Sequence, residues 1–315
     1  MNFIRSLTRT AAKLKFQWRK QNYAMAARLK DSADKAKTSS LRLMMLGSSG
    51  GGTLLGISLL SKSKAENETA YTDVPNLDLI IREADVLYDN YLIDNALGIL
   101  RRHAKGQCCE LLWRLARATC EKAKLCQDKE EKKRLFYESL DIIRRAIVNE
   151  REEGCSSAHK WYAIILDYTS AYEGTRARLH QSYEIRRHLE KALDIDGTDP
   201  TTWHILGLWH FTFADMPSYQ RLIASAVFET PPSSTYEDAL ANFEKAEYIR
   251  PNFYSANKWY LAEVHDRLNH KEEALKYYKE TYRMPVVTAD DCEFHAKAYA
   301  KLTKLLGTKD LSKMD

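Results

Sequence analysis

Five aromatic or cationic side chains recur at equivalent positions of a helical pattern, and their chemistry is that of a ligand-binding surface. They are Trp113, Arg117, Lys160, His204 and Trp259. Aromatic rings pack against extended peptides, and Lys and Arg pair with carboxylates and phosphates. We therefore expect these five residues to line a groove that binds an acidic peptide segment or an anionic lipid. Ordinary packing or a solvated surface is the alternative at each position.

The remaining reactive residue types show no metal-binding or nucleotide-binding arrangement. The nine histidines include no H-E-x-x-H motif, and the six cysteines include no C-x-x-C pair. A glycine-rich nucleotide fingerprint is also absent from the sequence. We predict a protein that is not an enzyme, needs no cofactor or metal, and keeps its cysteines as reduced thiols in a cytosol-like compartment.

The stretch from Trp203 to Pro251 has the pattern of one tetratricopeptide repeat with an interruption in its middle. Its first helix has the W-x-x-L-G spacing, and its second helix has the small and aromatic positions that precede a closing proline. Small residues such as Gly207 and Ala239 let two helices approach closely, so the pattern predicts a helix pair. The residues that carry it are Trp203, Leu206, Gly207, His210, Ala239, Phe243, Ala246 and Pro251.

The same spacing of small residues identifies four further helix pairs. Two of them keep the separation of an uninterrupted repeat, and two are longer. We predict an all-α fold, a right-handed tetratricopeptide-like α-solenoid of about five degenerate helix pairs over residues 77–315, with a C-terminal capping helix near 292–306. The paired positions are Ala84 with Ala96, Ala116 with Ser139, Ala163 with Ile185, and Ala262 with Ala274.

An insertion at about residues 211–233 separates the two helices of the interrupted repeat. Prolines bound it, and residues 216–228 have the apolar periodicity of a short extra helix. Ser234 and Glu237 have the spacing of a capping box that starts the next helix. We expect the extra helix to plug one side of the solenoid, with a partner-binding surface as the alternative.

Positive charge is concentrated at the N-terminus. Residues 1–64 contain 13 Lys and Arg and two acidic residues, whereas the whole chain has a formal net charge of +5. The rest of the chain is therefore mildly acidic, which excludes a nucleic-acid binder of the basic-stripe kind. Residues 1–40 predict a basic amphipathic helix that acts as a mitochondrial import signal or lies on an anionic membrane surface, or else a basic surface helix without an address function.

Residues 43–60 form an uncharged, largely apolar run with Lys and Arg on both sides. This run is near the lower limit for a membrane-spanning helix and is rich in glycine. The segment 41–62 is therefore either a short membrane anchor, of the mitochondrial outer-membrane kind, or a flexible linker. Residues 63–76 are polar and predict a linker to the solenoid. We expect the protein at the mitochondrion, with its solenoid facing the cytosol, and in the cytoplasm at microtubules or the spindle.

Several strings closely resemble the regulator of microtubule dynamics family, and they include the insertion, which a generic repeat does not contain. They are Glu110–Ala118, His159–Ala163, Phe211–Arg221, Thr230–Glu237 and Pro251–Ser255. The resemblance covers about residues 77–306. It implies a helical-repeat protein associated with microtubules and spindle poles, and mitochondrial association for some members. It also implies, for one membrane-tethered member with a longer N-terminal region, a role in organelle contacts and lipid binding.

Two functions follow as hypotheses. The first is a non-enzymatic scaffold that binds microtubules, tubulin or spindle proteins, with the basic N-terminal arm attracted to the acidic lattice. The alternative is a protein anchored in the mitochondrial outer membrane, whose groove binds lipid or a partner protein and whose residues 1–62 contact anionic lipid. A basic arm on an acidic lattice should bind less tightly as ionic strength rises, whereas lipid held in an apolar groove should not. Neither predicts a nucleic-acid partner.

Overall fold

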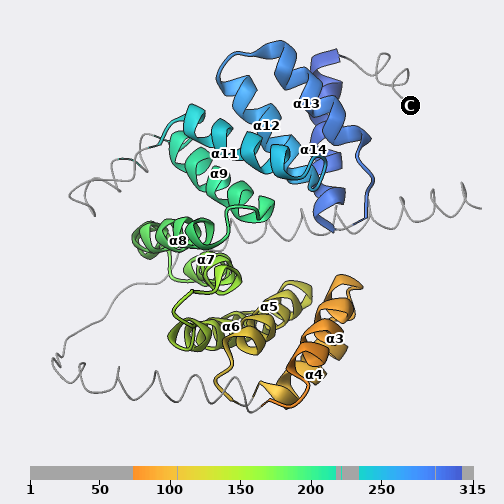
Figure 1. The fold of residues 1–315 in the computed structure, drawn as a ribbon. Helices are drawn as coiled ribbons and strands as arrows, with labels where there is room; N and C mark the ends of the chain where they lie inside the picture. Colours follow the sequence, from red (N-terminus) through yellow and green to blue (C-terminus); the bar gives the residue numbers. More distant parts are fainter. Residues whose placement is uncertain (1–73, 105, 218–220, 222–233, 288, 307–315) are drawn as a thin grey trace, which may run out of the picture. The chain divides into compact units, whose positions relative to one another are not determined.

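The computed structural model describes residues 74–104, 106–217, 221, 234–287 and 289–306. These residues form eleven α-helices, and no β-strand is present among them (Figure 1). They divide into two compact units, one with residues 74–253 and 264–269 and the other with 254–263 and 270–306. The predicted amphipathic helix, membrane anchor and most of the linker fall on residues 1–73, outside the described residues. Most of the expected extra helix at 216–228 lies outside them too.

Four helix pairs build the larger unit, and the helices of each pair pack on each other (Figure 1). This order confirms the predicted helical-repeat fold. The pairs are α3 (Leu77–Asp89) with α4 (Ile93–His103), α5 (Cys109–Leu125) with α6 (Lys129–Val148), α7 (Ser156–Ser170) with α8 (Thr175–Ile195), and α9 (Pro200–Ala214) with α11 (Tyr236–Ile249). The second and third pairs are long because α6 has 20 residues and α8 has 21.

The first helices of successive pairs form a continuous layer. Helix α5 contacts both α3 and α7, whereas α4 packs on α3 and α5, and α6 packs on α5 and α7. Apolar side chains fill the space between the two layers, among them Leu111, Ile143 and Leu166, which are all buried. The side chains of α3, α5 and α7 that point away from the second helices therefore form an inner surface.

Small residues lie where the paired helices approach, as the sequence predicts. Ala84, Ala116 and Ala163 are fully buried. Gly207 of α9 faces the ring of Phe243 on α11, so closely that a Cβ atom at position 207 would lie 2.8 Å from Cδ1 of that ring. A side chain of any size would push the two helices apart, which explains the glycine.

The start of the insertion differs from the prediction. We expected it to begin at Phe211, but α9 continues to Ala214 and is capped by Asp215. The reason is that Phe211 and Phe213 are buried and extend the apolar packing of the helix by one turn. The first proline that breaks the helical pattern is Pro217.

The capping box of α11 lies one residue later than predicted. Thr235 is the N-cap: its side chain accepts from the backbone N–H of Asp238, and the Asp238 carboxylate accepts from the N–H of Thr235. Ser234, the predicted cap, instead contacts Nδ1 of His210 at 2.5 Å. The prediction with Ser234 and Glu237 was therefore wrong by one position, because the Ser234 hydroxyl is in hydrogen-bond contact with His210.

The smaller unit contains α13 (Lys271–Arg283), α14 (Ala289–Leu306) and most of α12 (Ser255–Arg267). Its core is formed by Ala262, Ala274, Tyr278 and Leu302. The predicted C-terminal helix is confirmed and begins three residues earlier than expected. Among all the helices of the described residues, none has both the length and the apolar character needed to cross a membrane.

Candidate binding surface on the inner helices

The structure places two of the five predicted groove residues in direct contact. Trp113 and Arg117 both lie on α5, with the Arg117 guanidinium 5.0 Å from the centre of the Trp113 ring. Lys160 lies on α7, where it pairs with Asp199, and His204 lies on α9, where it packs against Phe243. Trp259 belongs to the smaller unit, where its ring is 5.3 Å from that of Tyr278.

Two of these predicted side chains are buried. The exposed fraction is 6% for Trp113 and 4% for His204. The His204 ring packs against Phe243, with 5.5 Å between ring centroids. In this conformation both rings hold helices together, and a ligand would have to displace neighbours to reach them. Ligand binding by these residues stays a prediction.

The two predicted cations are each paired with a carboxylate of the chain. Arg117 Nη2 lies 2.6 Å from Oδ1 of Asp85, and Lys160 Nζ lies 3.0 Å from Oδ2 of Asp199. Burial acts to raise the pKa of Asp199, but the Lys160 charge and the hydrogen bond from Thr202 outweigh it, so this pKa is below its usual value. An acidic ligand would therefore compete with Asp85 and Asp199 for these cations.

A third cation, Arg114, was missed from the sequence and has the most extensive contacts. Its Nε and Nη2 atoms donate to both oxygens of Asp85, at 2.9–3.1 Å. Its Nη1 lies 2.6 Å from Oε2 of Glu110, which also accepts from the Trp113 indole N–H at 2.9 Å. Burial acts to lower the pKa of Arg114, and the hydrogen bonds with Asp85 and Glu110 raise it above its ordinary value. The Arg114 charge is thus firmly held between α3 and α5.

Aromatic rings cover the other arginine. The Arg117 guanidinium lies 3.8 Å from the centre of the Tyr88 ring, on α3, in addition to its contact with Trp113. Burial, followed by the Glu121 charge, raises the pKa of the Tyr88 phenol, so this group stays neutral. A planar guanidinium between two rings gains a cation–π attraction that is stronger when water is excluded.

The polar contacts continue from α5 into the third helix pair. Oε1 of Glu110 accepts from the Cys155 thiol at 3.6 Å, and the Cys155 backbone N–H donates to Glu150 at 3.2 Å. Glu150 lies 3.1 Å from Nε2 of His159, whose Nδ1 is 2.7 Å from Nδ1 of His188 on α8. A single path of polar contacts therefore runs from Asp85 on α3 to His188 on α8.

The turn before α7 requires glycine. Gly154 has φ +79°, and a Cβ atom there would lie 2.6 Å from Cδ1 of Ile195. Glycine is the residue that adopts this backbone conformation at little cost. The turn lets Glu150 reach both the Cys155 amide and the His159 ring.

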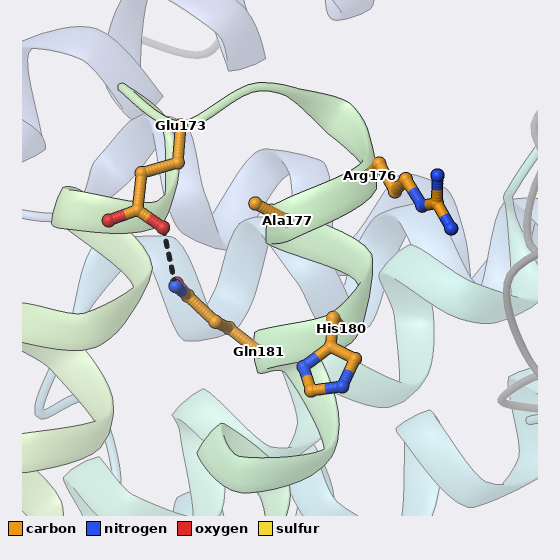
Figure 2. Close-up of a pocket in the computed structure, with 5 residues that line it drawn as sticks. All are labelled: Glu173, Arg176, Ala177, His180 and Gln181. Carbon is orange, nitrogen blue, oxygen red and sulfur yellow. Dashed lines mark hydrogen bonds between the residues drawn. The ribbon is translucent and has the colours of Figure 1, made fainter. Parts of the chain in front are cut away.

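The second helices carry open hollows of a different kind. One has a volume of about 510 Å³ and is lined by Glu173, Arg176, Ala177, His180 and Gln181. Figure 2 shows Gln181 pointing to Glu173, to which its Nε2 donates at 2.7 Å, while Arg176 extends away from them. A neighbouring hollow on α6 contains Tyr137, whose hydroxyl donates to Glu173 at 3.3 Å. Open surfaces of this kind suit a protein partner better than an enclosed small molecule.

Metal coordination finds no support in the described part of the chain. No group of three or more His, Cys, Asp and Glu side chains lies in an arrangement that could hold a metal ion there.

Comparison with known proteins assigns these features to a family. The profile described as Regulator of microtubule dynamics protein 1-3 matches residues 80–306. The chain belongs to the regulator of microtubule dynamics family. Regulator of microtubule dynamics protein 1 of Mus musculus is 41% identical over 227 residues, which cover 72% of this chain and 74% of the relative.

More distant similarities agree with this assignment. Regulator of microtubule dynamics protein 3 of Rattus norvegicus is 27% identical over 249 residues, or 78% of this chain and 52% of that relative. The chain therefore aligns with about half the length of that protein. Among solved structures, a thermophilic tetratricopeptide-repeat protein of Thermus thermophilus is similar with a TM-score of 0.50 and 15% identity, covering 71% of this chain and 98% of that one. This last similarity concerns the fold alone.

Proposed function

We propose that this chain is a non-enzymatic scaffold that regulates microtubule dynamics by binding microtubules, tubulin or a spindle protein. The observation that carries the proposal is the family match over residues 80–306, which includes the inner polar surface and the insertion. The Mus musculus relative, 41% identical, is named for this regulation. Repeat solenoids bind partners through the surfaces that successive repeats present, which fits this role.

The distribution of charge suggests which part of the chain supplies electrostatic attraction to a partner and which part supplies specificity. Arg114, Arg117 and Lys160 are already paired with carboxylates of the chain, so the inner surface offers little unpaired positive charge. Residues 1–64, in contrast, contain 13 Lys and Arg with two acidic residues. We infer that the N-terminal arm supplies the attraction to an acidic lattice and that the helical pairs supply specificity.

Co-sedimentation with microtubules tests this division. The full chain and a variant without residues 1–40 are compared at about 50 mM and about 200 mM salt. We expect the full chain to bind severalfold more weakly at the higher salt, and the shortened variant to bind weakly at both. Equal binding by the two proteins would contradict the role of the arm.

A variant with intact length separates charge from chain length in the same experiment. Arg5, Arg9, Lys13 and Lys20 are replaced together by Gln, which keeps the arm and removes four positive charges. We expect this variant to behave like the shortened one. Binding equal to that of the full chain would contradict a role for these four charges.

A second candidate function is favoured by the uncharged run at residues 43–60. Here we propose a mitochondrial anchor, with the solenoid on the cytosolic side and with lipid or a partner protein as its ligand. Imaging the full chain and a form that starts at Lys64, both tagged at the C-terminus, tests whether residues 1–63 direct the protein to mitochondria. Mitochondrial signal that disappears on truncation supports the anchor, whereas the same distribution of both forms contradicts it. Lipid held in an apolar groove would resist added salt, unlike binding through the arm.

A further inference from the structure

The second helices of the first three pairs carry an excess of positive charge that the first helices lack. The outer surface consists of the exposed side chains of α4, α6 and α8, the second helices of these pairs (Figure 1). These three helices contain 13 Lys and Arg and eight Asp and Glu, whereas α3, α5 and α7 contain six and seven. The outer surface is therefore a local concentration of positive charge on a body that is mildly acidic.

Each of these outer helices presents one exposed arginine without a carboxylate partner. They are Arg102 on α4, Arg145 on α6 and Arg176 on α8. None of the three forms an ion pair with an Asp or Glu of the described residues, and Arg145 donates to the Gly106 carbonyl at 3.5 Å. The cations of the inner surface are already paired, so these outer arginines offer more accessible positive charge to an anionic ligand.

Two hollows lie beside two of these arginines and meet at one hydrogen bond. Arg145 lines the hollow on α6, of about 420 Å³, and Arg176 lines the hollow of about 510 Å³ at the start of α8. The Tyr137 hydroxyl of the first hollow donates to Glu173 of the second at 3.3 Å. Figure 2 shows Arg176 extending away from Glu173, so these two charges are not paired. A recessed strip therefore runs from α6 to α8 between the two arginines.

The carboxylates of the two hollows have partners within the chain. Their partners are Arg101 and Arg134 for Glu138, Arg144 for Asp141, and Tyr137 and Gln181 for Glu173. A carboxylate that accepts such contacts repels an incoming anion less than an unpaired one would. The strip can therefore accept an acidic ligand without first releasing one of its own ion pairs.

We propose that the outer surface of α4, α6 and α8 binds an extended acidic peptide segment of a protein partner. An arginine pairs with a carboxylate through two parallel N–H···O bonds, and the hollows leave room for peptide side chains between the cations. A bilayer surface would meet the exposed arginines but could not enter the hollows, which favours a peptide. The inference deepens the proposed function, on which it rests for the kind of partner, by giving the helical pairs their own contact with an acidic protein.

Photochemical linking of a synthetic peptide to the full chain tests the proposal. The probe is a poly-Glu peptide of about 12 residues, about 40 Å long when extended, that carries a photoreactive benzophenone. We expect links in α4, α6 and α8, and a severalfold weaker interaction at about 200 mM salt than at about 50 mM. The peptide concentration that gives half-maximal linking to α6 and α8 reports the affinity of this surface, apart from that of the N-terminal arm.

Matched variants decide which charges carry the binding. Arg102→Gln, Arg145→Gln and Arg176→Gln should each weaken linking about two- to fivefold, and the triple variant about tenfold or more, because each removes one exposed ion pair. Arg178→Gln is the control on α8, since this exposed arginine already lies 3.1 Å from Asp167, and linking should be nearly unchanged. Circular dichroism checks that each variant is folded, and the single variants decide the question if the triple variant is not.

The other occupants of this surface give different results. Links confined to residues 1–64, or to α3, α5 and α7, would overturn the proposal, as would equal linking by the triple variant and Arg178→Gln. Vesicles that contain phosphatidylserine test the membrane: vesicle binding that the triple variant loses, without peptide links in α6 and α8, would also overturn it. Peptide links that persist in a chain that does not co-sediment with microtubules would support this surface and contradict the proposed function alone.

Discussion

The Nδ1 atoms of His159 and His188 face each other at 2.7 Å inside the third helix pair. One of these nitrogens must donate and the other must accept, so the pair holds one proton between the rings. A second proton would place two N–H donors against each other. Glu150 lies at the far side of His159, and Tyr162 stacks on His188 with ring centroids 4.2 Å apart.

This pair should make stability depend on pH. Burial, followed by the His159 charge, lowers the pKa of His188 from 6.5 to about 4. Between about pH 6.5 and pH 4, His188 binds a proton in the unfolded chain but not in the folded one. Its contribution to stability is therefore complete above about pH 6.5 and is lost as the pH falls toward 4. We expect a loss of about 2 kcal/mol between about pH 7.5 and about pH 5, measured by urea unfolding.

An exposed histidine provides the control for this effect. His188→Gln should flatten the pH dependence, whereas His103→Gln, at an exposed position of α4, should preserve it. Burial acts to raise the pKa of Glu150, but its contacts with His159 outweigh this effect and the pKa is lowered. Protonation of Glu150 therefore affects stability only at a more acidic pH than protonation of His188. The same slope in His188→Gln as in the unchanged protein would show that the pair does not carry the effect.

Gly207 should tolerate no added methyl group. In Gly207→Ala the new Cβ would lie 2.8 Å from the Phe243 ring, so α9 and α11 would have to separate. We expect a loss of about 1–3 kcal/mol in the free energy of unfolding. Gly98→Ala is the matched control, because a Cβ at position 98 of α4 meets nothing within 4 Å. That change should stabilise by up to about 1 kcal/mol through helix propensity, and destabilisation by both changes to the same extent would refute the packing explanation.

The repeat architecture was predictable because its signal is local. Small residues such as Ala84 and Gly207 recur in the first helix of each pair, where the paired helices approach, and each unit needs its neighbours to bury its apolar faces. The cap of α11 was misplaced because Ser234 and Thr235 are both good caps with an acidic residue three positions later. The deciding factor was His210, which is 24 positions from Ser234 and invisible to local rules.

The inner polar contacts were missed for a related reason. Glu110 and Arg114 have the i,i+4 spacing of a helical ion pair, which could have been read from the sequence. Asp85 and Arg114 are 29 positions apart, as are His159 and His188, and their contact depends on how successive pairs stack. Identifying the five groove positions by spacing therefore found Arg117 but not the carboxylate that pairs with it.

Arg114 should matter more for stability than an exposed arginine. In Arg114→Leu both Asp85 and Glu110 lose a partner, and Trp113 loses a guanidinium 4.1 Å from its ring. Asp85 keeps its contact with Arg117, and the Glu110 side chain is about a third exposed to water, so the lost charged hydrogen bonds should cost about 1–3 kcal/mol. Arg134→Leu, which removes the exposed contacts to Glu131 and Glu138, should leave the unfolding midpoint nearly unchanged. Equal effects in thermal unfolding would mean that the inner contacts are no stronger than surface pairs.

Thr235 should be the residue that starts α11. Its hydroxyl accepts from the Asp238 amide at 3.0 Å, so Thr235→Ala leaves that amide without its partner and should cost about 1 kcal/mol. Asp238→Ala removes the reciprocal hydrogen bond to the Thr235 amide. Both hydrogen bonds belong to the same capping box, so the double variant should lose less stability than the sum of the two single variants. Ser234→Ala loses the contact to His210 and a hydrogen bond to the Asp238 carboxylate, so its effect on unfolding should shrink in a His210→Phe background, whereas the effect of Thr235→Ala should persist there in full. The reverse pattern would return the cap to Ser234 and show that the helix starts where the sequence first suggested.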